Sequence, residues 1–425
     1  MQQRSLHYYA DLRFAVRHLF LWILHPERTE RSDTLFTLPV LVFVFLSFLL
    51  GTSEFLVIGI LPVLAADLNV SLTIAGGLVS LFAFAYAAGT ILLTSATARA
   101  NRRSLLLVLV IAFVLGNLIS AAADSYLLFL ASRFVVAGVS GTLISVAMTF
   151  ANDITSPKNR PAMIAWIYSG FSIAAVVGVP AGTMLAAFWG WRLSFVLISV
   201  LSVGLFFLLL YCLPRVAASP GQKMLHQFVL FADRRILPGI AIVICSAAAT
   251  YAFYTYLTPI FETEIGIPAG YLGAALMAFG ACSIASNLLS GRIAARKGIA
   301  GLRVPFVLQI LLLAFLPVLL GFPAAGFCAI LGLGVLMYLM NASTQMHFLD
   351  VAVRDHPDAV NLASSIAPVS FNIGIGLGAL LGGVVVDAAG LREVGYCGAL
   401  LAAGALAAVI VLMRQCKGAA DGCYR

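Results

Sequence analysis

The amino-acid sequence predicts an all-α membrane protein with twelve transmembrane helices in two six-helix pseudo-repeats and both termini in the cytoplasm. Of its 425 residues, 62% are apolar and only 10% are charged, whereas a soluble domain is roughly 45–50% apolar and about 25% charged. The apolar residues form runs close to the ~20 residues that a helix needs to cross a bilayer. Parts of two of these runs also repeat 200 residues apart.

The solvent of such a chain has to be lipid, because a soluble globule must cover itself with polar groups. In lipid the backbone satisfies its own hydrogen bonds, so spanning segments are helices or closed barrels. Barrel strands alternate apolar and polar residues over about 10 positions, and the runs here are longer and continuous. We therefore expect helices.

The apolar runs divide the chain into two bundles. The spans are expected at about 36–60, 74–98, 104–123, 126–150, 162–187, 193–213, 236–261, 269–291, 304–322, 325–348, 360–386 and 394–414. The predicted domains are an N-terminal extension (1–35), a six-helix bundle (36–213), a cytoplasmic linker (214–235), a second six-helix bundle (236–414) and a cytoplasmic tail (415–425).

The extension carries apolar residues at helical spacing, namely Leu12, Val16, Leu19 and Ile23, beside several basic residues. This pattern is typical of an amphipathic helix lying on the inner membrane surface. The alternative, that part of the extension is disordered, stays open.

Basic residues set the expected orientation. With the N-terminus in the cytoplasm, 22 of the 25 lysines and arginines lie in cytoplasmic loops or tails, and only Arg192 and Arg392 lie on the other side. Short loops rich in Lys and Arg stay cytoplasmic. We therefore expect a multi-pass protein of the cell (inner) membrane. The net charge of +8 then reflects the basic residues of the cytoplasmic loops. We therefore expect the lipid bilayer as a partner, and not nucleic acid.

Glycines mark the repeat between the fifth and eleventh spans. Phe171 and Phe371 are 200 residues apart, as are the last two glycines of each segment, and the same offset is assigned to the first and seventh spans. Internal repeats allow many transporters to form a midplane site between two moving bundles. Small residues allow close helix approach and proline allows a bend, although ordinary packing remains an alternative; the residues concerned are Gly178, Pro180, Gly182, Gly374 and Gly378.

Two charged side chains lie well inside spans, Glu54 in the first and Arg133 in the fourth. A charge in the bilayer costs at least ~2.5–3.5 kcal/mol, and such residues face the protein interior or a cavity. Both lie roughly 8–9 Å to the outer side of the midplane, so they could meet if the two spans are neighbours. The functional hypothesis is that Glu54 carries the coupling proton, with Arg133 tuning it. The alternatives are a fixed ion pair, or Arg133 as a substrate ligand or an anchor to backbone carbonyls.

Several polar residues inside the second half are candidates for the lining of a substrate cavity. Position 254, which lies 200 residues after Glu54, is a tyrosine, so the second half lacks the acid. Aromatic and amide groups could hold an uncharged or polyhydroxylated ligand, although each could equally stabilise a helix contact. The candidates are Tyr251, Tyr254, Asn341, Gln345 and Asn372.

Neither catalytic motifs nor cofactor motifs are recognisable. The chain lacks the P-loop pattern GxxxxGK[ST], which disfavours ATP-driven transport. The six histidines and seven cysteines show no metal-ligand spacing. We therefore expect no enzyme, no metal, no cofactor and no disulfide framework, and a proton gradient as the source of energy.

The motifs resemble those of the major facilitator superfamily over nearly all of residues 36–414. The segment Arg133 to Gly138 resembles the fourth-helix motif R-x-x-x-x-G, and Gly178 to Gly182 resembles the antiporter motif G-P-x-x-G with one residue inserted before the proline. The first span around Glu54 and the eleventh around Asn372 are similar to the sugar-efflux and arabinose-efflux-like branch of the twelve-helix drug:proton antiporters.

The loop motif G-x-x-x-D-R-x-G-R-[KR] after the second helix is degenerate here, because its glycines and its aspartate are missing. A second copy retains glycines but also has alanine in place of aspartate. The matching residues are Arg99, Arg102 and Arg103 in the first copy and Gly291, Arg296 and Gly298 in the second. The family's charge-relay gate at this loop therefore lacks its aspartate in this chain, although the basic residues remain.

The resemblance implies proton-coupled efflux of a small organic solute, such as a sugar, a drug or a related metabolite, by alternating access. It implies that the first, fourth, seventh and tenth helices line the cavity. We expect small-molecule substrate and protons as partners and a functional monomer. An uncoupled facilitator or importer, and a non-transporting membrane sensor on the same fold, remain alternatives.

Overall fold

The computed structural model describes residues 37–97, 100–150, 154, 160–213, 230–231, 233–356 and 359–418. All regular secondary structure in these ranges is helical. The predicted extension 1–35, most of the linker 214–235 and the last part of the tail lie outside the described residues.

The first half of the chain forms α2 (Leu38–Gly59), α3 (Leu61–Asp67), α4 (Leu72–Ala96), α5 (Arg102–Ala121), α6 (Tyr126–Thr149), α8 (Arg160–Ile173), the π-turn η1 (Ala174–Gly178), α9 (Val179–Trp189) and α10 (Trp191–Cys212). The second half forms α11 (Ile236–Tyr254), α12 (Leu257–Pro259), the π-turn η3 (Ile260–Glu264), α13 (Ala269–Lys297), η4 (Gly298–Leu302), α14 (Arg303–Leu319), α15 (Pro323–Leu336), α16 (Asn341–Asp355), α17 (Val360–Ala389), η6 (Leu391–Glu393) and α18 (Val394–Gly418).

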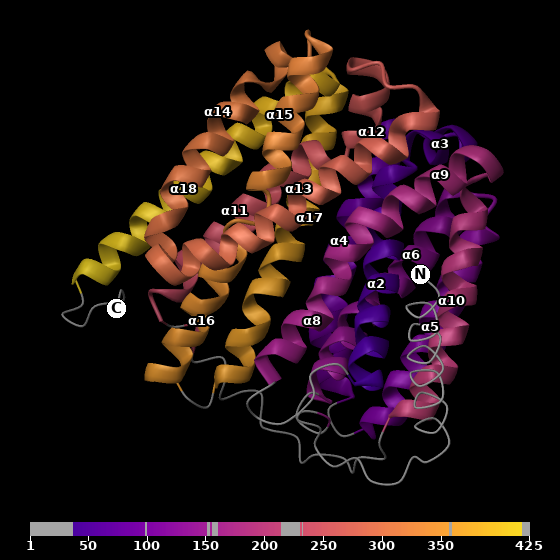
Figure 1. Ribbon diagram of the computed structural model, residues 1–425, viewed down its shortest axis with the longest axis horizontal. Coiled ribbons are helices and arrows are strands. Elements are labelled where there is room, and N and C mark those ends of the chain that lie inside the picture. The colour runs from indigo at the N-terminus through magenta and orange to yellow at the C-terminus, as the bar shows by residue number, and fades with distance from the viewer. Residues whose placement is uncertain are drawn as a thin grey trace, which may run out of the picture.

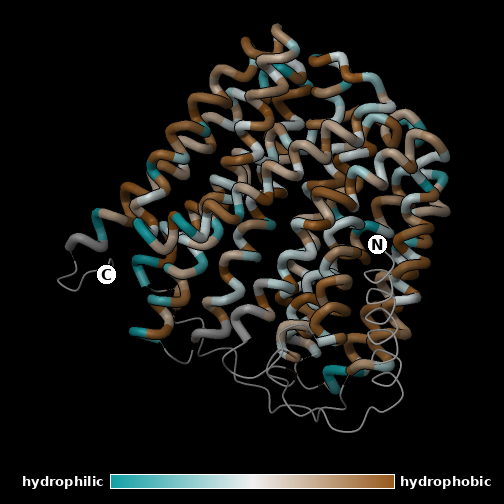
Figure 2. The backbone as a smooth tube through the Cα atoms, in the orientation of Figure 1, coloured by the Kyte–Doolittle hydropathy of each residue, from teal (hydrophilic) through white to brown (hydrophobic). Residues whose placement is uncertain are grey.

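Eleven helical stretches of the described residues are long and apolar enough to cross a membrane. One of them, Ala269–Leu319, has 51 residues and contains both α13 and α14, separated by the short turn η4. Figure 2 shows apolar residues along most helices of the molecule. The described part of the chain is therefore all-helical, and its apolar stretches indicate a multi-pass membrane protein.

Three predicted spans are interrupted in the structure. The fifth changes from α8 to α9 through η1, two residues before Pro180. Proline lacks the N–H group that continues a helix, and π-turns accommodate such local breaks. The seventh is interrupted after Tyr254 and the tenth between Leu336 and Asn341. Interrupted helices in a membrane lie where protein or a cavity surrounds them.

The helices form two groups, as Figure 1 shows. Helices α2 to α10 lie on one side, and helices α11 to α18 lie on the other. Within the first group α2 packs on α8, α4 on α6 and α5 on α10, and within the second α11 packs on α17 and α18. The two groups meet where α4 packs on α17 and where α9 packs on α13.

Glycines bring equivalent helix pairs together in the two halves. A β-carbon on Gly178 would lie 2.1 Å from Thr52 Oγ1 of α2, and one on Gly378 would lie 2.4 Å from the Ala248 carbonyl oxygen of α11. Gly182 meets Leu56 and Gly382 meets Ala252 in the same way. Gly374 likewise approaches Ala247. These glycines therefore serve close packing inside each half.

These contacts correct the predicted offset between the first and seventh spans. Gly178 and Gly378 are 200 residues apart, but their partners Thr52 and Ala248 are only 196 residues apart. The packing counterpart of Glu54 is thus Thr250, not Tyr254. Four residues are about one helical turn, so an error of this size keeps the helix face and escapes detection from periodicity. The second half still lacks an acid at the equivalent position.

The two halves are joined at the end of the molecule that carries α3 and α12, called here the α12 end. Thr258 Oγ1 donates a buried hydrogen bond of 2.8 Å to the Ile58 carbonyl oxygen of the first half, and Thr73 donates to the Asp387 carboxylate. The Tyr256 side chain lies against Gly76 of α4. Toward the ends of α8 and α16 the ribbons of the two halves diverge (Figure 1).

Candidate functional site

Arg133, on α6, is buried and its hydrogen-bond donors are occupied. Its Nε donates to Ser120 Oγ at 3.1 Å, and one terminal nitrogen donates to Ser53 Oγ at 3.0 Å and to the Ser53 carbonyl oxygen at 3.3 Å. The other terminal nitrogen donates to Asn117 Oδ1 at 3.0 Å and to Ser120 Oγ at 2.5 Å. Arginine has five N–H groups, and these five contacts match that number.

Two aromatic rings pack against the Arg133 guanidinium, and two of its hydrogen-bond partners are themselves hydrogen-bonded to each other. The guanidinium carbon lies 5.5 Å from the ring centroid of Phe129 and 4.7 Å from that of Phe195, which are attractive cation–π distances. Ser53 Oγ in turn donates to Asn117 Oδ1 at 2.7 Å. Arg133 is only 1% exposed. The arrangement fits the anchor alternative, although only one acceptor is a backbone carbonyl, and it leaves no N–H group for a substrate.

Glu54 and Arg133 lie close in the fold without pairing. The first and fourth spans are neighbours, as the contacts between Ser53 and Arg133 show. Ion pairs among the described residues do not include Glu54. Successive residues of a helix point about 100° apart. Because Ser53 faces α6, the next side chain along α2 faces a different neighbour.

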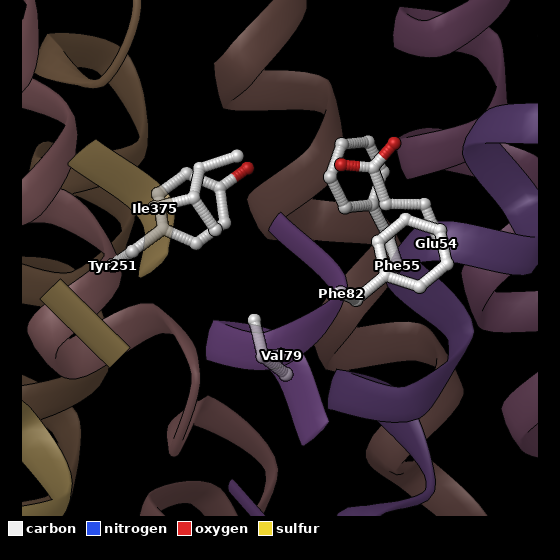
Figure 3. Close-up of a pocket in the computed structure, with 6 residues that line it drawn as sticks. All are labelled: Glu54, Phe55, Val79, Phe82, Tyr251 and Ile375. Atoms are coloured by element: carbon white, nitrogen blue, oxygen red, sulfur yellow. The ribbon is translucent and has the colours of Figure 1, made fainter. Parts of the chain in front are cut away.

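Glu54 instead lines a narrow cavity between the two halves. The cavity is lined by Glu54, Phe55, Val79, Phe82, Tyr251 and Ile375, and its volume of about 10 Å³ holds about one water molecule. In Figure 3, the first-half residues Glu54, Phe55 and Phe82 lie across the space from Tyr251 and Ile375 of the second half. The lining comes from α2, α4, α11 and α17. The first and seventh spans therefore contribute as the resemblance implied, but the fourth and tenth contribute none of the six lining residues.

Aromatic side chains surround the second-half wall of this cavity. Tyr251 is 1% exposed, and its ring lies edge-on to Tyr254 at 5.2 Å and to Phe371 at 5.9 Å between centroids. Tyr338 packs on Phe371 at 6.0 Å. The hydroxyl of Tyr251 is buried without a hydrogen bond of ordinary geometry to a described residue. The phenols of Tyr86, Tyr251, Tyr254 and Tyr338 lie within electrostatic range of the Glu54 carboxyl.

The three amide residues predicted for the cavity bind other helix groups. Asn341 donates to Asn287 Oδ1 at 3.3 Å, and Gln345 donates to a backbone carbonyl oxygen of α17 at 3.3 Å. Asn372 donates to the Pro368 carbonyl oxygen at 3.2 Å, while its own Oδ1 is buried without a described partner. None of the three lines the cavity that contains Glu54.

Sequence reasoning missed the polar partners of Arg133 and two of the tyrosines near Glu54. Asn117 and Ser120 are three residues apart in an otherwise apolar helix, which places them on one face. That spacing was the available signal for a buried polar cluster. Tyr86 and Tyr338 had no comparable signal, since aromatic residues are frequent throughout the chain.

The residues of the loop motif act locally where the structure describes them. Arg102 and Arg103 begin α5, which the Asn101 side chain caps, and Arg103 donates to the Leu210 carbonyl oxygen at 2.5 Å. Gly298 ends α13 with a φ of 50°, a value that favours glycine. Gly291 and Arg296 are exposed on α13, and Arg99 lies outside the described residues.

A family model described as Major Facilitator Superfamily matches residues 43–356, well over half of the chain. The chain belongs to the major facilitator superfamily. The family inferred from the motifs is thus confirmed, and this superfamily member is a membrane transporter rather than an enzyme.

The similarity to three relatives extends over most of this chain and most of each relative. The uncharacterized MFS-type transporter YtbD of Bacillus subtilis (strain 168) is 33% identical, covering 85% of this chain and 91% of its own. The chloramphenicol resistance protein of Streptomyces lividans is 28% identical, covering 86% and 92%. A "Probable sugar efflux transporter" of Mannheimia succiniciproducens is also 28% identical, covering 86% and 91%.

Solved structures share the fold of this transporter. A bacterial homologue of the human lysosomal transporter Spinster, in an inward-facing and occupied conformation, superimposes with a TM-score of 0.70 at 16% identity. The match covers 88% of this chain and 96% of that one.

Proposed function

We propose that this transporter exports a small organic solute in exchange for protons by alternating access. The observation that carries the proposal is the position of Glu54. It is the acid that lies deep within a described span, it faces a cavity between the two halves and it forms no ion pair with any residue that the structure describes. A carboxyl group in that position can be protonated and deprotonated as the halves move.

Arg133 has a different role in this proposal. Its donors bind α2 and α5, so it holds the first half together beside the acid. The charge that the transport cycle changes is then that of Glu54 alone. Glu54 can then exchange a proton while the hydrogen bonds of Arg133 stay intact.

We also infer twelve crossings with both ends of the chain in the cytoplasm. The 51 residues of Ala269–Leu319 would extend to about 75 Å as one helix, far beyond the ~30 Å hydrocarbon core. The turn η4 therefore separates two crossings. An even number of crossings places both ends on one side, and the basic loops assign that side to the cytoplasm.

The described conformation fits a state closed to the outside. The hydrogen bonds from Thr258 and Thr73 join the halves at the α12 end, which is the outer end in the orientation proposed above. The ribbons diverge toward the other end (Figure 1). The similarity in fold to an inward-facing transporter supports the same assignment.

Relatives support export as the direction. Two of them are named for sugar efflux and for chloramphenicol resistance. A functional monomer is consistent with a cavity built from both halves of one chain.

The test is transport in proteoliposomes. Radiolabelled chloramphenicol and arabinose are offered with an imposed pH gradient to wild type, to Glu54→Gln and to the surface control Asp350→Asn. We expect gradient-driven movement in wild type and the control, and its loss in Glu54→Gln. Gradient-driven movement that persists in Glu54→Gln would contradict the proton-carrier role. Movement that ignores the gradient in all three proteins would indicate an uncoupled facilitator, and none at all would favour a membrane sensor.

A further inference from the structure

The break in the tenth span leaves backbone donors without their helical acceptors. The span runs as α15 to Leu336 and resumes as α16 at Asn341. Within the break, the N–H group of Leu339 donates to the Leu336 carbonyl oxygen and that of Asn341 to the Tyr338 carbonyl oxygen, each three residues back. A continuous α-helix would use the carbonyl oxygen four residues back. Other N–H groups of the break therefore need acceptors from outside the span.

Two serine hydroxyls of α13 accept these N–H groups. The N–H group of Tyr338 donates to Ser286 Oγ at 2.8 Å, and that of Ala342 donates to Ser290 Oγ at 2.9 Å. Both serines are buried. The serines are four residues apart, as are the two N–H groups, so one turn of α13 matches the length of the break. In a membrane, such side chains of a neighbouring helix satisfy the backbone groups that a broken helix frees.

The residues of the break do not by themselves require it. Positions 337–340 are Met, Tyr, Leu and Met, none of which is glycine or proline. Methionine and leucine favour helices, and sharp kinks arise at proline, at glycine or where a side chain inserts into the hydrogen-bond ladder. The equivalent fourth span is a continuous helix, α6. The serine hydroxyls of α13 are therefore the cause of the break that the structure offers, and the same residues can also form a continuous helix.

Asn287 links this contact to the first half of the molecule. It lies between the two serines in the sequence of α13, and its Nδ2 donates to Ser172 Oγ of α8 at 3.3 Å. Its Oδ1 accepts from Asn341 Nδ2 at 3.3 Å, directly after the break. Neighbouring side chains of α13 thus bind both the broken span and the first half. A change in the separation of the halves therefore acts on the residues that hold the break.

We propose that Ser286 and Ser290 are positioning residues that hold the tenth span broken in the described conformation, and that the span becomes a continuous helix when the halves open at the α12 end. In that change the N–H groups of Tyr338 and Ala342 exchange the serine hydroxyls for the carbonyl oxygens of Gly334 and Tyr338. The inner part of the span, α16, turns relative to α15 as these bonds are exchanged. The proposal rests on the proposed function insofar as it requires the two conformations of alternating access.

A distance measurement across the α12 end of the full-length protein in lipid nanodiscs tests the proposal. Spin labels are placed at Val63 on α3 and Tyr271 on α13, which are exposed and belong to different halves, and electron–electron resonance gives the ratio of open to closed molecules. The double variant Ser286→Ala/Ser290→Ala leaves two buried N–H groups without acceptors in the closed conformation alone. We expect the ratio of open to closed molecules to rise about fivefold or more for each acceptor removed.

The matched control is Ser283→Ala on the same helix. Ser283 is also buried, but its hydroxyl donates to the Gly280 carbonyl oxygen of α13 itself, so its loss leaves no N–H group of the tenth span without an acceptor. The control should keep the wild-type ratio. Thermal unfolding confirms that each variant is folded, and the single variants Ser286→Ala and Ser290→Ala provide the same comparison if the double variant does not fold.

Two results would overturn the proposal. An unchanged ratio in the folded serine variants would show that the hydroxyls hold the break in both conformations and serve packing alone. An equal rise in Ser283→Ala would show that any loss of a hydroxyl from α13 has the same effect. Because the measurement uses neither a solute nor a pH gradient, its failure leaves proton-coupled export standing. Conversely, gradient-driven movement that persists in Glu54→Gln would leave the role of the serines intact.

Discussion

Substitution of Gly76 by alanine should push the two halves apart at the α12 end. A β-carbon at this position of α4 would lie 2.4 Å from Tyr256 Oη and 2.8 Å from its Cζ. Tyr256 belongs to the second half and is 0% exposed. A β-carbon on Gly383 would lie 2.8 Å from the same oxygen. The phenol oxygen thus lies between two glycines, and a methyl group added to either of them would overlap it.

The size of the effect follows from this overlap. The new carbon needs about 1 Å of additional space to reach the 3.4 Å of an ordinary contact. Overpacking of this kind costs about 1–3 kcal/mol. If the cost falls only on the conformation joined at the α12 end, the equilibrium shifts about five- to 150-fold toward the conformation open at that end.

Electron–electron resonance between two spin labels measures the shift. Val63 on α3 and Tyr271 on α13 belong to different halves and are 46% and 68% exposed, so both accept a label in a background without cysteines. The matched control is Gly77→Ala, because a β-carbon on this neighbouring glycine meets nothing within 4 Å. We expect the fraction of long distances to rise in Gly76→Ala and to stay at the wild-type level in Gly77→Ala.

Equal distance distributions in the two alanine variants would refute the reasoning. A second check is Tyr256→Phe in the Gly76→Ala background. It removes the oxygen at 2.4 Å and leaves the ring carbon at 2.8 Å, so the shift should become smaller. An unchanged shift in the double variant would show that the hydroxyl is not the obstacle.

Three further substitutions test packing, the buried charge and an ion pair at the start of α11. Gly382→Ala places a β-carbon 2.3 Å from the Ala252 carbonyl oxygen and should lower the unfolding temperature through about 1–3 kcal/mol of overpacking; the control Gly204→Ala, with open space around it, should not. Arg133→Lys should also lower it, because lysine has three N–H groups in place of five, and an unchanged temperature would contradict the anchor role. Hydrogen bonds from an adjacent arginine lower the pKa of Asp233 from 3.8 to about 2. This stabilisation is present above pH 3.8 and is lost as the pH falls through 2, so Asp233→Asn should cost at most about 2 kcal/mol at pH 7, and the difference between the two proteins should vanish only well below pH 2.

Span positions could be predicted from hydropathy, but backbone breaks could not. The first span was expected at 36–60 and α2 covers Leu38–Gly59; the fourth was expected at 126–150 and α6 covers Tyr126–Thr149. The turn η1 and the interruption after Leu336 leave the apolar run intact. Hydropathy reports the solvent around a segment, whereas a π-turn changes only which carbonyl each N–H group meets.

At the candidate site, the sequence predicts how deep a charged side chain lies in the membrane but not which way it points around its helix. Glu54 and Arg133 stand out because each is a charge in an apolar run, and helical rise gives their depth. The direction of each side chain around its helix depends on which neighbours pack there. Ser53, one residue before the acid, binds Arg133, and the acid itself faces the other half. Ser53 and Glu54 point about 100° apart around α2, and the depth of a residue does not show which of the two faces Arg133.

The two halves share a scaffold but differ in the cavity, and this difference has a mechanical consequence. Glycines allow close approach of η1 and α9 to α2 in the first half and of α17 to α11 in the second. The first half presents the carboxyl of Glu54 from α2, and the second presents the ring of Tyr251 from α11. A solute bound between them contacts two helices that belong to different rigid pairs. Its binding energy therefore depends on the separation of the halves, and only such a difference between conformations allows a ligand to shift their equilibrium.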